Sequence, residues 1–204
     1  MNIHKYPEYK PGKKLLCRMY VAIMLWVVGR AIQAAAKMDK DIKKEFSELP
    51  DDFVMSLGIL PEEAYQPNFL ARILPSFITE RGILPLGLYM IIGKDKKGRV
   101  RYMGSNPKGK RITLQMAIKN LQAAMLVFTF RESTTTAFAH DRFIVNGDLV
   151  QGLAIVRVLN IIEVYLLPKI IAKLAVKRYP KWSEMNPIRK HLLRILIYLR
   201  AFTF

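Results

Sequence analysis

Large apolar side chains occupy every second position from Ile112 to Ile118, alternating with Thr113, Gln115 and Ala117. This period of two is typical of a β-strand with one buried face. Upstream, an apolar run at 86–92 and an alternating segment at 99–103 flank 93–98, where glycines and lysines compose a turn. Together they predict a hairpin, and a further short strand is expected at 142–146.

Outside the predicted strands, the apolar spacing favours helices. Asp148 has the side chain of a helix N-cap, and Pro187 occupies a first helical position. Between residues 51 and 85, proline and glycine recur often enough to predict only short helical pieces and turns. The expected helices cover residues 15–36, a charged continuation at 37–48, and then 121–130, 149–167 and 186–204.

The first apolar segment has two interpretations. Lysines precede the run from Met19 to Val28 and three alanines follow it, which resembles a signal peptide. Arg18 and Arg30 leave only 11 residues between charges, whereas a membrane-spanning helix needs about 20 apolar residues. We therefore expect an amphipathic or buried helix here, with a cleaved signal as the alternative, and no spanning segment elsewhere.

The composition adds a strong positive charge to this picture. Of 204 residues, 51% are hydrophobic and 24% are charged, and the formal net charge is +17. So large an excess implies a polyanionic partner, either nucleic acid or anionic lipid. The single cysteine, Cys17, cannot form an internal disulfide and is expected to be a buried apolar residue.

Basic residues gather in two stretches, one from Lys94 to Arg111 and one at the C-terminal end. The C-terminal ones sit beside leucine and isoleucine faces rather than among exposed aromatic residues, which disfavours nucleic acid as a partner. An interfacial helix on an anionic membrane fits this pattern better, and a solvated basic face over an ordinary core is the alternative. The expected membrane contacts are Lys173, Lys177, Arg178, Lys190 and Arg194.

Catalytic and metal-binding motifs are absent from the sequence. The histidines are widely separated, and there is no phosphate-binding glycine loop, no Cys-x-x-Cys and no nucleophile elbow. Glu132, His140 and Asp141 form one acid–histidine group, for which we favour surface polar residues over a general acid–base role. We therefore predict a non-catalytic protein without a metal or a cofactor.

Several local motifs follow one another in a distinctive order. The strand 112–118 leads through Lys119-Asn120 into the helix 121–130, and Thr136-Ala137-Phe138 comes next. The strand Phe143-Ile144-Val145 and the sequence Asn146-Gly147-Asp148-Leu149 complete the series. This succession resembles the recurrent core pattern of the sterol carrier protein type-two family and covers about 85 of the 204 residues.

The resemblance implies an α+β fold, in which helices cover a small antiparallel β-sheet and enclose an apolar cavity or tunnel. It divides the chain into an N-terminal helical extension (1–80), a sterol-carrier-like core (81–168) and basic amphipathic helices (169–204). Methionine and phenylalanine suit an adaptable apolar pocket, although a filled core uses the same residues. The expected wall positions are Met116, Met125, Leu126, Phe128, Phe130, Phe138, Leu153, Val156 and Leu159.

The predicted function is non-catalytic lipid binding or lipid transfer by a cytoplasmic protein that docks peripherally on the anionic inner membrane. Its ligand would be a sterol, a phospholipid, a fatty acyl chain or an isoprenoid. One alternative is an accessory subunit that presents a lipid precursor to partner enzymes of isoprenoid-quinone biosynthesis. Another is a small enzyme acting on a bound lipid with His140 or Glu132.

Overall fold

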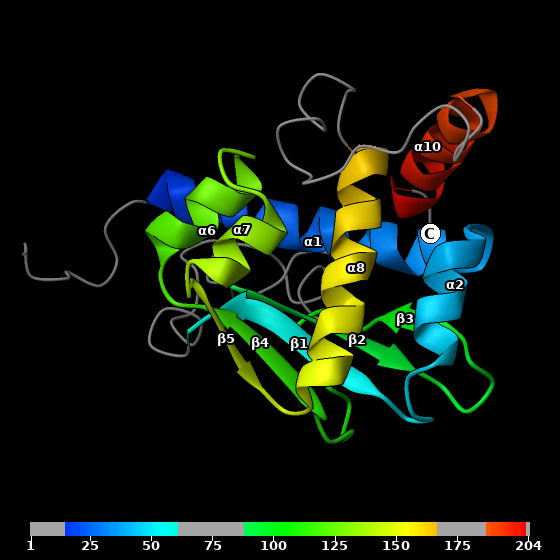
Figure 1. The fold of residues 1–204 in the computed structure, drawn as a ribbon, viewed down its shortest axis with the longest axis horizontal. Coiled ribbons are helices and arrows are strands. Elements are labelled where there is room, and N and C mark those ends of the chain that lie inside the picture. The colour runs from blue at the N-terminus through cyan, green and yellow to red at the C-terminus, as the bar shows by residue number, and fades with distance from the viewer. Residues whose placement is uncertain (1–14, 61–87, 167–186, 203–204) are drawn as a thin grey trace, which may run out of the picture.

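The computed structural model describes residues 15–60, 88–166 and 187–202. Within these residues the fold is α+β, with an open five-stranded sheet and helices (Figure 1). In chain order the elements are α1 (Leu15–Met38), α2 (Lys40–Ser47), β1 (Val54–Ile59), β2 (Tyr89–Lys94), β3 (Val100–Tyr102), β4 (Leu114–Ile118), α6 (Leu121–Phe128), α7 (Thr134–Ala139), β5 (Phe143–Asn146), α8 (Leu149–Leu166) and α10 (Pro187–Phe202).

The sheet is mixed, and the expectation of a wholly antiparallel sheet was wrong. Its strand order is β3-β2-β1-β4-β5. Three of the pairs are antiparallel, but β1 runs parallel to β4, with Met55 opposite Leu114 and Leu57 opposite Met116. The parallel pair arises because a strand that the sequence did not predict, β1, lies at the centre of the sheet.

The central strand β1 lies in the stretch that was predicted to be short helices and turns, and that prediction was wrong there. All six residues from Val54 to Ile59 are buried. A strand buried on both faces has no polar alternation, so it lacks the signal that identified β4. Residues 1–80 were predicted to be a helical extension outside the core domain. Two elements from this region, β1 and α1, contribute residues to the hydrophobic core.

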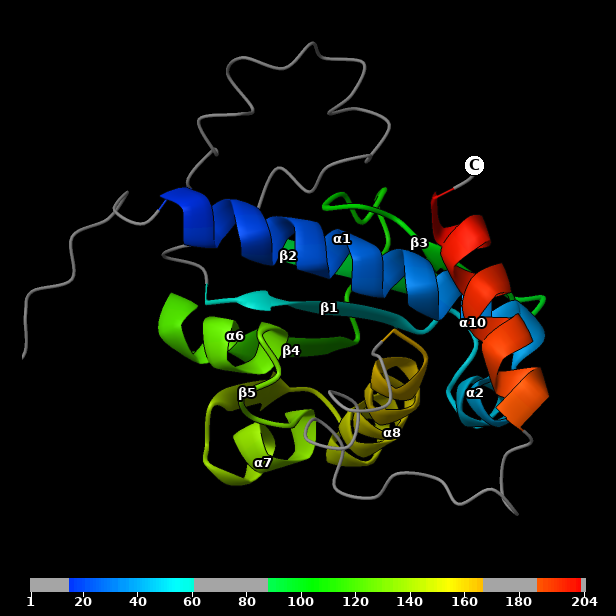
Figure 2. The same cartoon turned by 90° about the horizontal axis from the view of Figure 1, so that it is seen from above.

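The helices α1 and α8 pack on the same face of the sheet. The register places Leu57 of β1 beside Met116 of β4 on this face, and both belong to one apolar cluster with Val28 of α1 and Leu159 of α8. Figure 1 and Figure 2 show that α1 and α8 cross steeply rather than run side by side. Helix α6 packs against α1 and β4.

Most of the predicted elements outside β1 are confirmed. The hairpin is β2–β3, and the later strands and helices begin and end close to the expected residues. Asp148 caps α8 as predicted, because its Oδ1 accepts the backbone N–H of Val150 at 2.8 Å. The charged continuation of the first helix is instead a separate helix, α2, which begins after a break at Asp39.

Asp39 joins three helices through one buried carboxylate. Its Oδ1 accepts the backbone N–H groups of Asp41 and Ile42, at 2.9 and 3.0 Å, and so caps α2. Its Oδ2 accepts the hydroxyl of Tyr165, from the last turn of α8, at 2.5 Å. Both side chains are almost fully buried, so these bonds satisfy a carboxylate that would otherwise be expensive to desolvate.

Replacing Tyr165 with phenylalanine should therefore destabilise the fold more than losing an ordinary tyrosine hydroxyl. We expect Tyr165→Phe to lower the free energy of unfolding by about 1–3 kcal/mol, because the Asp39 carboxylate stays buried with one bond fewer. Urea unfolding measures this. Tyr20→Phe is the matched control: its hydroxyl donates to the backbone carbonyl of Phe128 at 2.8 Å, a neutral acceptor. A loss no larger than that of the control would contradict the role given to Asp39.

Candidate functional site

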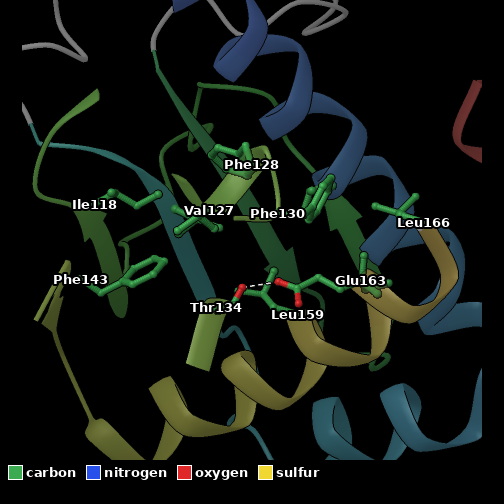
Figure 3. A pocket seen from close by; sticks show the side chains of 12 residues that line it. Ile118, Val127, Phe128, Phe130, Thr134, Phe143, Leu159, Glu163 and Leu166 are labelled. Carbon is green, nitrogen blue, oxygen red and sulfur yellow. Dashed lines mark hydrogen bonds between the residues drawn. The ribbon is translucent and has the colours of Figure 1, made fainter. Parts of the chain in front are cut away.

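A small apolar pocket lies where the sheet meets the crossing helices (Figure 3). Strands β1, β4 and β5 form one side, and α1, α6, α7 and α8 form the other. The lining residues are Val28, Leu57, Ile118, Val127, Phe128, Phe130, Thr134, Phe143, Leu159, Ile162, Glu163 and Leu166.

The pocket has a volume of about 30 Å³. An engineered apolar cavity that binds benzene has about 150 Å³. Pockets for cofactors and drug-sized molecules have about 300–1,000 Å³. In this structure the pocket therefore accommodates no acyl chain or sterol, and either would need wall side chains to move.

Glu163 brings a carboxyl group into this apolar environment. It projects from α8, and its Oε1 accepts the hydroxyl of Thr134, at the start of α7 (Figure 3). Its other oxygen, Oε2, is buried and has no hydrogen-bond partner among the described residues. A buried polar atom without a partner is rare in folded proteins and often marks a functional position.

Burial raises the pKa of Glu163 from 4.5 to about 7, while hydrogen bonds from Thr134 oppose the shift. Desolvation disfavours the charged form, and no cation is among the described residues that line the pocket. Near neutral pH much of this carboxyl is therefore protonated. In that form it can both donate to and accept from a hydroxyl or carbonyl group.

Phe130 reaches the pocket from an unusual backbone position. It follows α6 with a φ of 59°, in the left-handed region. Its N–H bonds to the carbonyl of Val127 and the N–H of Arg131 bonds to that of Leu126, both at 3.0 Å, which is the pattern of a Schellman motif. Glycine is the usual residue here, and a bulky side chain costs about 1–2 kcal/mol. The helix end thus holds an aromatic ring against the pocket at a cost in backbone strain.

Three of the nine predicted wall residues line this pocket, namely Phe128, Phe130 and Leu159. Met116 and Val156 are buried elsewhere in the core. Leu153 is 43% exposed. The remaining three, Met125, Leu126 and Phe138, are partly buried and lie outside the pocket wall.

Sequence reasoning missed the polar members of the pocket, Glu163 and Thr134. One signal was available for Glu163, because it is the single acidic residue in the apolar helix from Leu149 to Leu166. A lone carboxylate in such a helix either reaches solvent at its edge or is buried for a reason. No local pattern marked Thr134, which meets Glu163 only through the tertiary fold.

In the acid–histidine group at 132–141, a mostly buried Glu132 side chain contacts His140 and Arg142, which are more exposed. Glu132 contacts His140 Nδ1 through Oε1 and Arg142 Nε through Oε2, each at 2.5 Å. Asp141 points elsewhere and pairs with Lys119. None of these residues is among the described residues that line the pocket. Among the described residues, no group of three or more His, Cys, Asp or Glu side chains gathers as a metal site would require.

Helix α10 docks on the protein with its less apolar face. Arg194 donates from Nε to the carbonyl of Tyr165 at 2.8 Å and from Nη2 to that of Val164 at 3.2 Å, and Tyr198 donates to Leu166. These bonds supply donors to three carbonyl groups in the last turn of α8, where the described part of that helix ends. Ile197 is fully buried beneath them.

The apolar stripe of α10 faces solvent instead. Leu192, Ile195, Leu196 and Leu199 follow the i, i+3, i+4, i+7 spacing of one helix face, and they are 48–57% exposed. We call these four residues the outer stripe. The sequence from Pro187 to Phe204 contains four arginines and lysines and no acidic residue.

The predicted membrane contacts divide between three situations. Arg194 donates hydrogen bonds to carbonyl groups at the end of α8. Lys190 belongs to α10, but its side chain is outside what the structure describes, and Lys173, Lys177 and Arg178 lie outside the described residues altogether. Lys94, from the other basic stretch, is buried and donates to the carbonyl of Leu49 at 2.6 Å.

Two described helices are apolar and long enough to cross a membrane by length and composition, namely Leu16–Met38 and Leu149–Leu166. About half of each is buried inside the protein, 50% and 56% respectively. Core helices of soluble proteins and signal sequences share these properties. Their packing over the sheet accounts for the apolar composition without a bilayer.

Neither a scan against protein-family models nor searches of curated proteins and of solved structures finds a match for this chain.

Glu163 makes the stability of the fold depend on pH in a specific direction. The unfolded chain ionises this carboxyl near 4.5 and the folded chain near 7, so the folded state binds the extra proton between those values. Stability therefore falls as pH rises through this window, and above it the ionised carboxylate costs on the order of 3 kcal/mol.

We expect Glu163→Gln to raise the free energy of unfolding at pH 8 and to leave it nearly unchanged at pH 4. Glutamine keeps an oxygen for the Thr134 hydroxyl and carries no charge at either pH. Urea unfolding of both chains at the two pH values measures the difference. Asp148→Asn, an exposed carboxylate at the start of α8, is the control. A Glu163→Gln effect of equal size at both pH values would rule out the proposed ionisation.

Proposed function

We propose that this protein binds lipids and docks on anionic membrane surfaces, on the cytoplasmic side, through helix α10. The outer stripe carries the proposal, because an apolar helix face turned to solvent beside basic residues is the arrangement of an interfacial helix. Its leucine and isoleucine side chains would enter the headgroup region. Arginine and lysine residues of α10, together with the net charge of +17, would attract anionic lipid.

The anchoring of α10 supports a docking role over a loosely attached tail. Its inner face is fixed to the end of α8 by Arg194 and Tyr198, and Ile197 is buried there. The outer stripe is therefore presented in a defined orientation relative to the core (Figure 2). Membrane contact through the stripe would also bring the C-terminal ends of α1 and α8 close to the bilayer.

The apolar pocket is the proposed site for part of the lipid. Its walls are apolar except for Thr134 and Glu163. Burial of each CH₂ group contributes about 0.8 kcal/mol, so a chain that enlarged the pocket would be held without polar chemistry. Because the pocket measures about 30 Å³ in this structure, lipid entry requires displacement of wall side chains. Phe130, on a strained backbone, is the wall residue we expect to move.

The protonation state of Glu163 would determine which polar group the bound lipid can carry at its end. A protonated carboxyl can exchange hydrogen bonds with a hydroxyl or carbonyl group, whereas an ionised one repels a carboxylate. Lipids that end in a hydroxyl or carbonyl are therefore favoured over free fatty acids at neutral pH.

Membrane docking predicts a specific loss when the outer stripe is made polar. We expect the double variant Leu192→Gln and Leu199→Gln to bind phosphatidylserine-containing vesicles at least about tenfold more weakly, because two side chains lose apolar transfer energy. Glutamine preserves helix propensity. Vesicle flotation at low and high salt measures the binding, and the salt dependence reports the electrostatic part.

The matched control changes two apolar residues at the other end of α8. Leu149 and Val150 are at least as exposed as the outer stripe, at 57% and 72%, so Leu149→Gln with Val150→Gln removes similar apolar surface. We expect vesicle binding to survive in this control. An equal loss in both variants, or wild-type binding insensitive to salt and to anionic lipid, would refute docking through α10.

Lipid uptake predicts that truncating Phe130 opens the pocket. Phe130→Ala should raise the affinity for a fluorescent acyl-chain probe by about tenfold, because the ring no longer has to be displaced. Phe138→Ala is the matched control, since Phe138 packs beside Phe143 without lining the pocket. Probe titration measures both variants. Unchanged affinity in Phe130→Ala would show that ligands do not enter here.

Native mass spectrometry of the purified chain, with organic extraction, tests the proposal directly. A discrete adduct that extracts as one lipid class would support it. A bare polypeptide after incubation with anionic and sterol-containing vesicles would overturn lipid binding. If enzymes of isoprenoid-quinone biosynthesis then co-purified through the outer stripe, the accessory-subunit function would replace it.

A further inference from the structure

A second concave site lies between the C-terminal half of α1 and the β2–β3 hairpin, and its lining is basic. The groove has a volume of about 620 Å³, within the range of about 300–1,000 Å³ typical of ligand sites. Asp95 is the one carboxylate among its described lining residues. The cations are Arg30 and Lys37 from α1, Arg99 and Arg101 from the hairpin, and Lys108 and Lys110 from the following loop.

Asp95 forms its hydrogen bonds and its ion pair within the hairpin turn. Its Oδ1 accepts the backbone N–H groups of Lys97 and Arg99, at 3.0 and 2.9 Å, and its Oδ2 pairs with Arg99 Nε at 2.9 Å. Lys37, Arg101, Lys108 and Lys110 form no ion pair with any described acidic residue. Like charges gathered around a concave surface repel one another and concentrate a field that attracts anions.

Tyr102 adds a neutral hydrogen-bond donor to the groove. Its hydroxyl is buried and has no hydrogen-bond partner among the described residues. Burial raises the pKa of this phenol far above its ordinary value, although the positive charge of Arg30 opposes the shift. The hydroxyl therefore keeps its proton, and a bound oxygen would accept a hydrogen bond from it once a neighbouring side chain moves aside.

The groove is held in shape by contacts between α1 and β3. The backbone N–H of Tyr102 donates to Gln33 Oε1 at 2.7 Å. The ring of Tyr102 lies against Gly29, where an added Cβ would come within 2.6 Å of the ring. Residues 69 and 73 positions apart in sequence thus meet in one wall of the groove.

We propose that this groove binds a phosphate-bearing anion. Several unpaired cations match the multiple charges of a phosphate or pyrophosphate group, and a buried hydroxyl donor matches one of its oxygens. The anion is either a free phosphorylated small molecule or the headgroup of a lipid, which share this chemistry. The inference does not depend on the outer stripe or on the apolar pocket.

The test compares two variants of the full chain with the same change in net charge. The groove variant carries Arg101→Gln, Lys108→Gln and Lys110→Gln, all at exposed positions. The control carries Lys40→Gln, Lys43→Gln and Lys44→Gln, on the exposed side of α2. Calorimetric titration with inorganic pyrophosphate should show binding by the wild type and the control, and about tenfold or greater weakening in the groove variant.

A second arm identifies the source of the anion. Vesicles of phosphatidylcholine with and without phosphatidic acid are compared with soluble inositol trisphosphate. Binding of both soluble phosphates supports a free ligand, whereas binding only of phosphatidic acid vesicles, lost in the groove variant, supports a headgroup. Tyr102→Phe should weaken either interaction several-fold while leaving thermal unfolding nearly unchanged.

Three outcomes would overturn the inference. The wild type could bind neither pyrophosphate nor phosphatidic acid vesicles. The groove and control variants could lose binding equally, which would indicate net charge alone. Double-stranded nucleic acid could bind through the groove while pyrophosphate and phosphatidic acid vesicles do not. Because pyrophosphate has no apolar part, its binding is independent of lipid uptake, so failure here is distinguishable from failure of the proposed function.

Discussion

The steep crossing of α1 and α8 over one face of the sheet is the constraint on which the rest of the structure depends. Where the two helices cross over the five-stranded sheet, α6 packs against α1 and β4. Val127, Phe128 and Phe130 reach the pocket from α6 and the turn after it. The pocket is the volume that these side chains leave unfilled. Glu163 faces it from α8, which passes beside the pocket. Packing geometry therefore sets both the place and the polarity of the candidate site.

The positions of α1 and α8 also determine where the basic residues of α10 and of the groove lie. The C-terminal ends of α1 and α8 carry α10 on one side, and the hairpin packs against α1 on another. Arg194 is used to close α8, which leaves the outer stripe exposed. Arg30 and Lys37 meet the hairpin cations in the groove. The protein thus presents both an exposed apolar helix face and a basic groove, and these two features are the basis of the proposed membrane docking and the proposed phosphate binding.

Local physics explains which elements could be predicted from the sequence. The alternation at 112–118, the glycine-bounded turn at 93–98 and the cap at Asp148 are signals carried by neighbouring residues, and β4, the β2–β3 turn and α8 follow them. β1 was not predicted, because a strand buried on both faces has no alternation of apolar and polar residues. Phe128, Phe130 and Leu159 were expected at a pocket wall and lie at one, whereas Glu163 and Thr134 come together only across 29 residues.

The sequence by itself determined the α+β composition, the positive charge and the amphipathic character of the last helix. Only the tertiary structure decided which face of that helix meets the protein. Periodicity places Leu192, Ile195, Leu196 and Leu199 on one stripe, and burial is the usual outcome for such a stripe. Here Arg194 and Tyr198, on the opposite face, donate hydrogen bonds to carbonyl groups in the last turn of α8. Hydrogen bonds that the helix could form only with a distant segment therefore turned its apolar face outward.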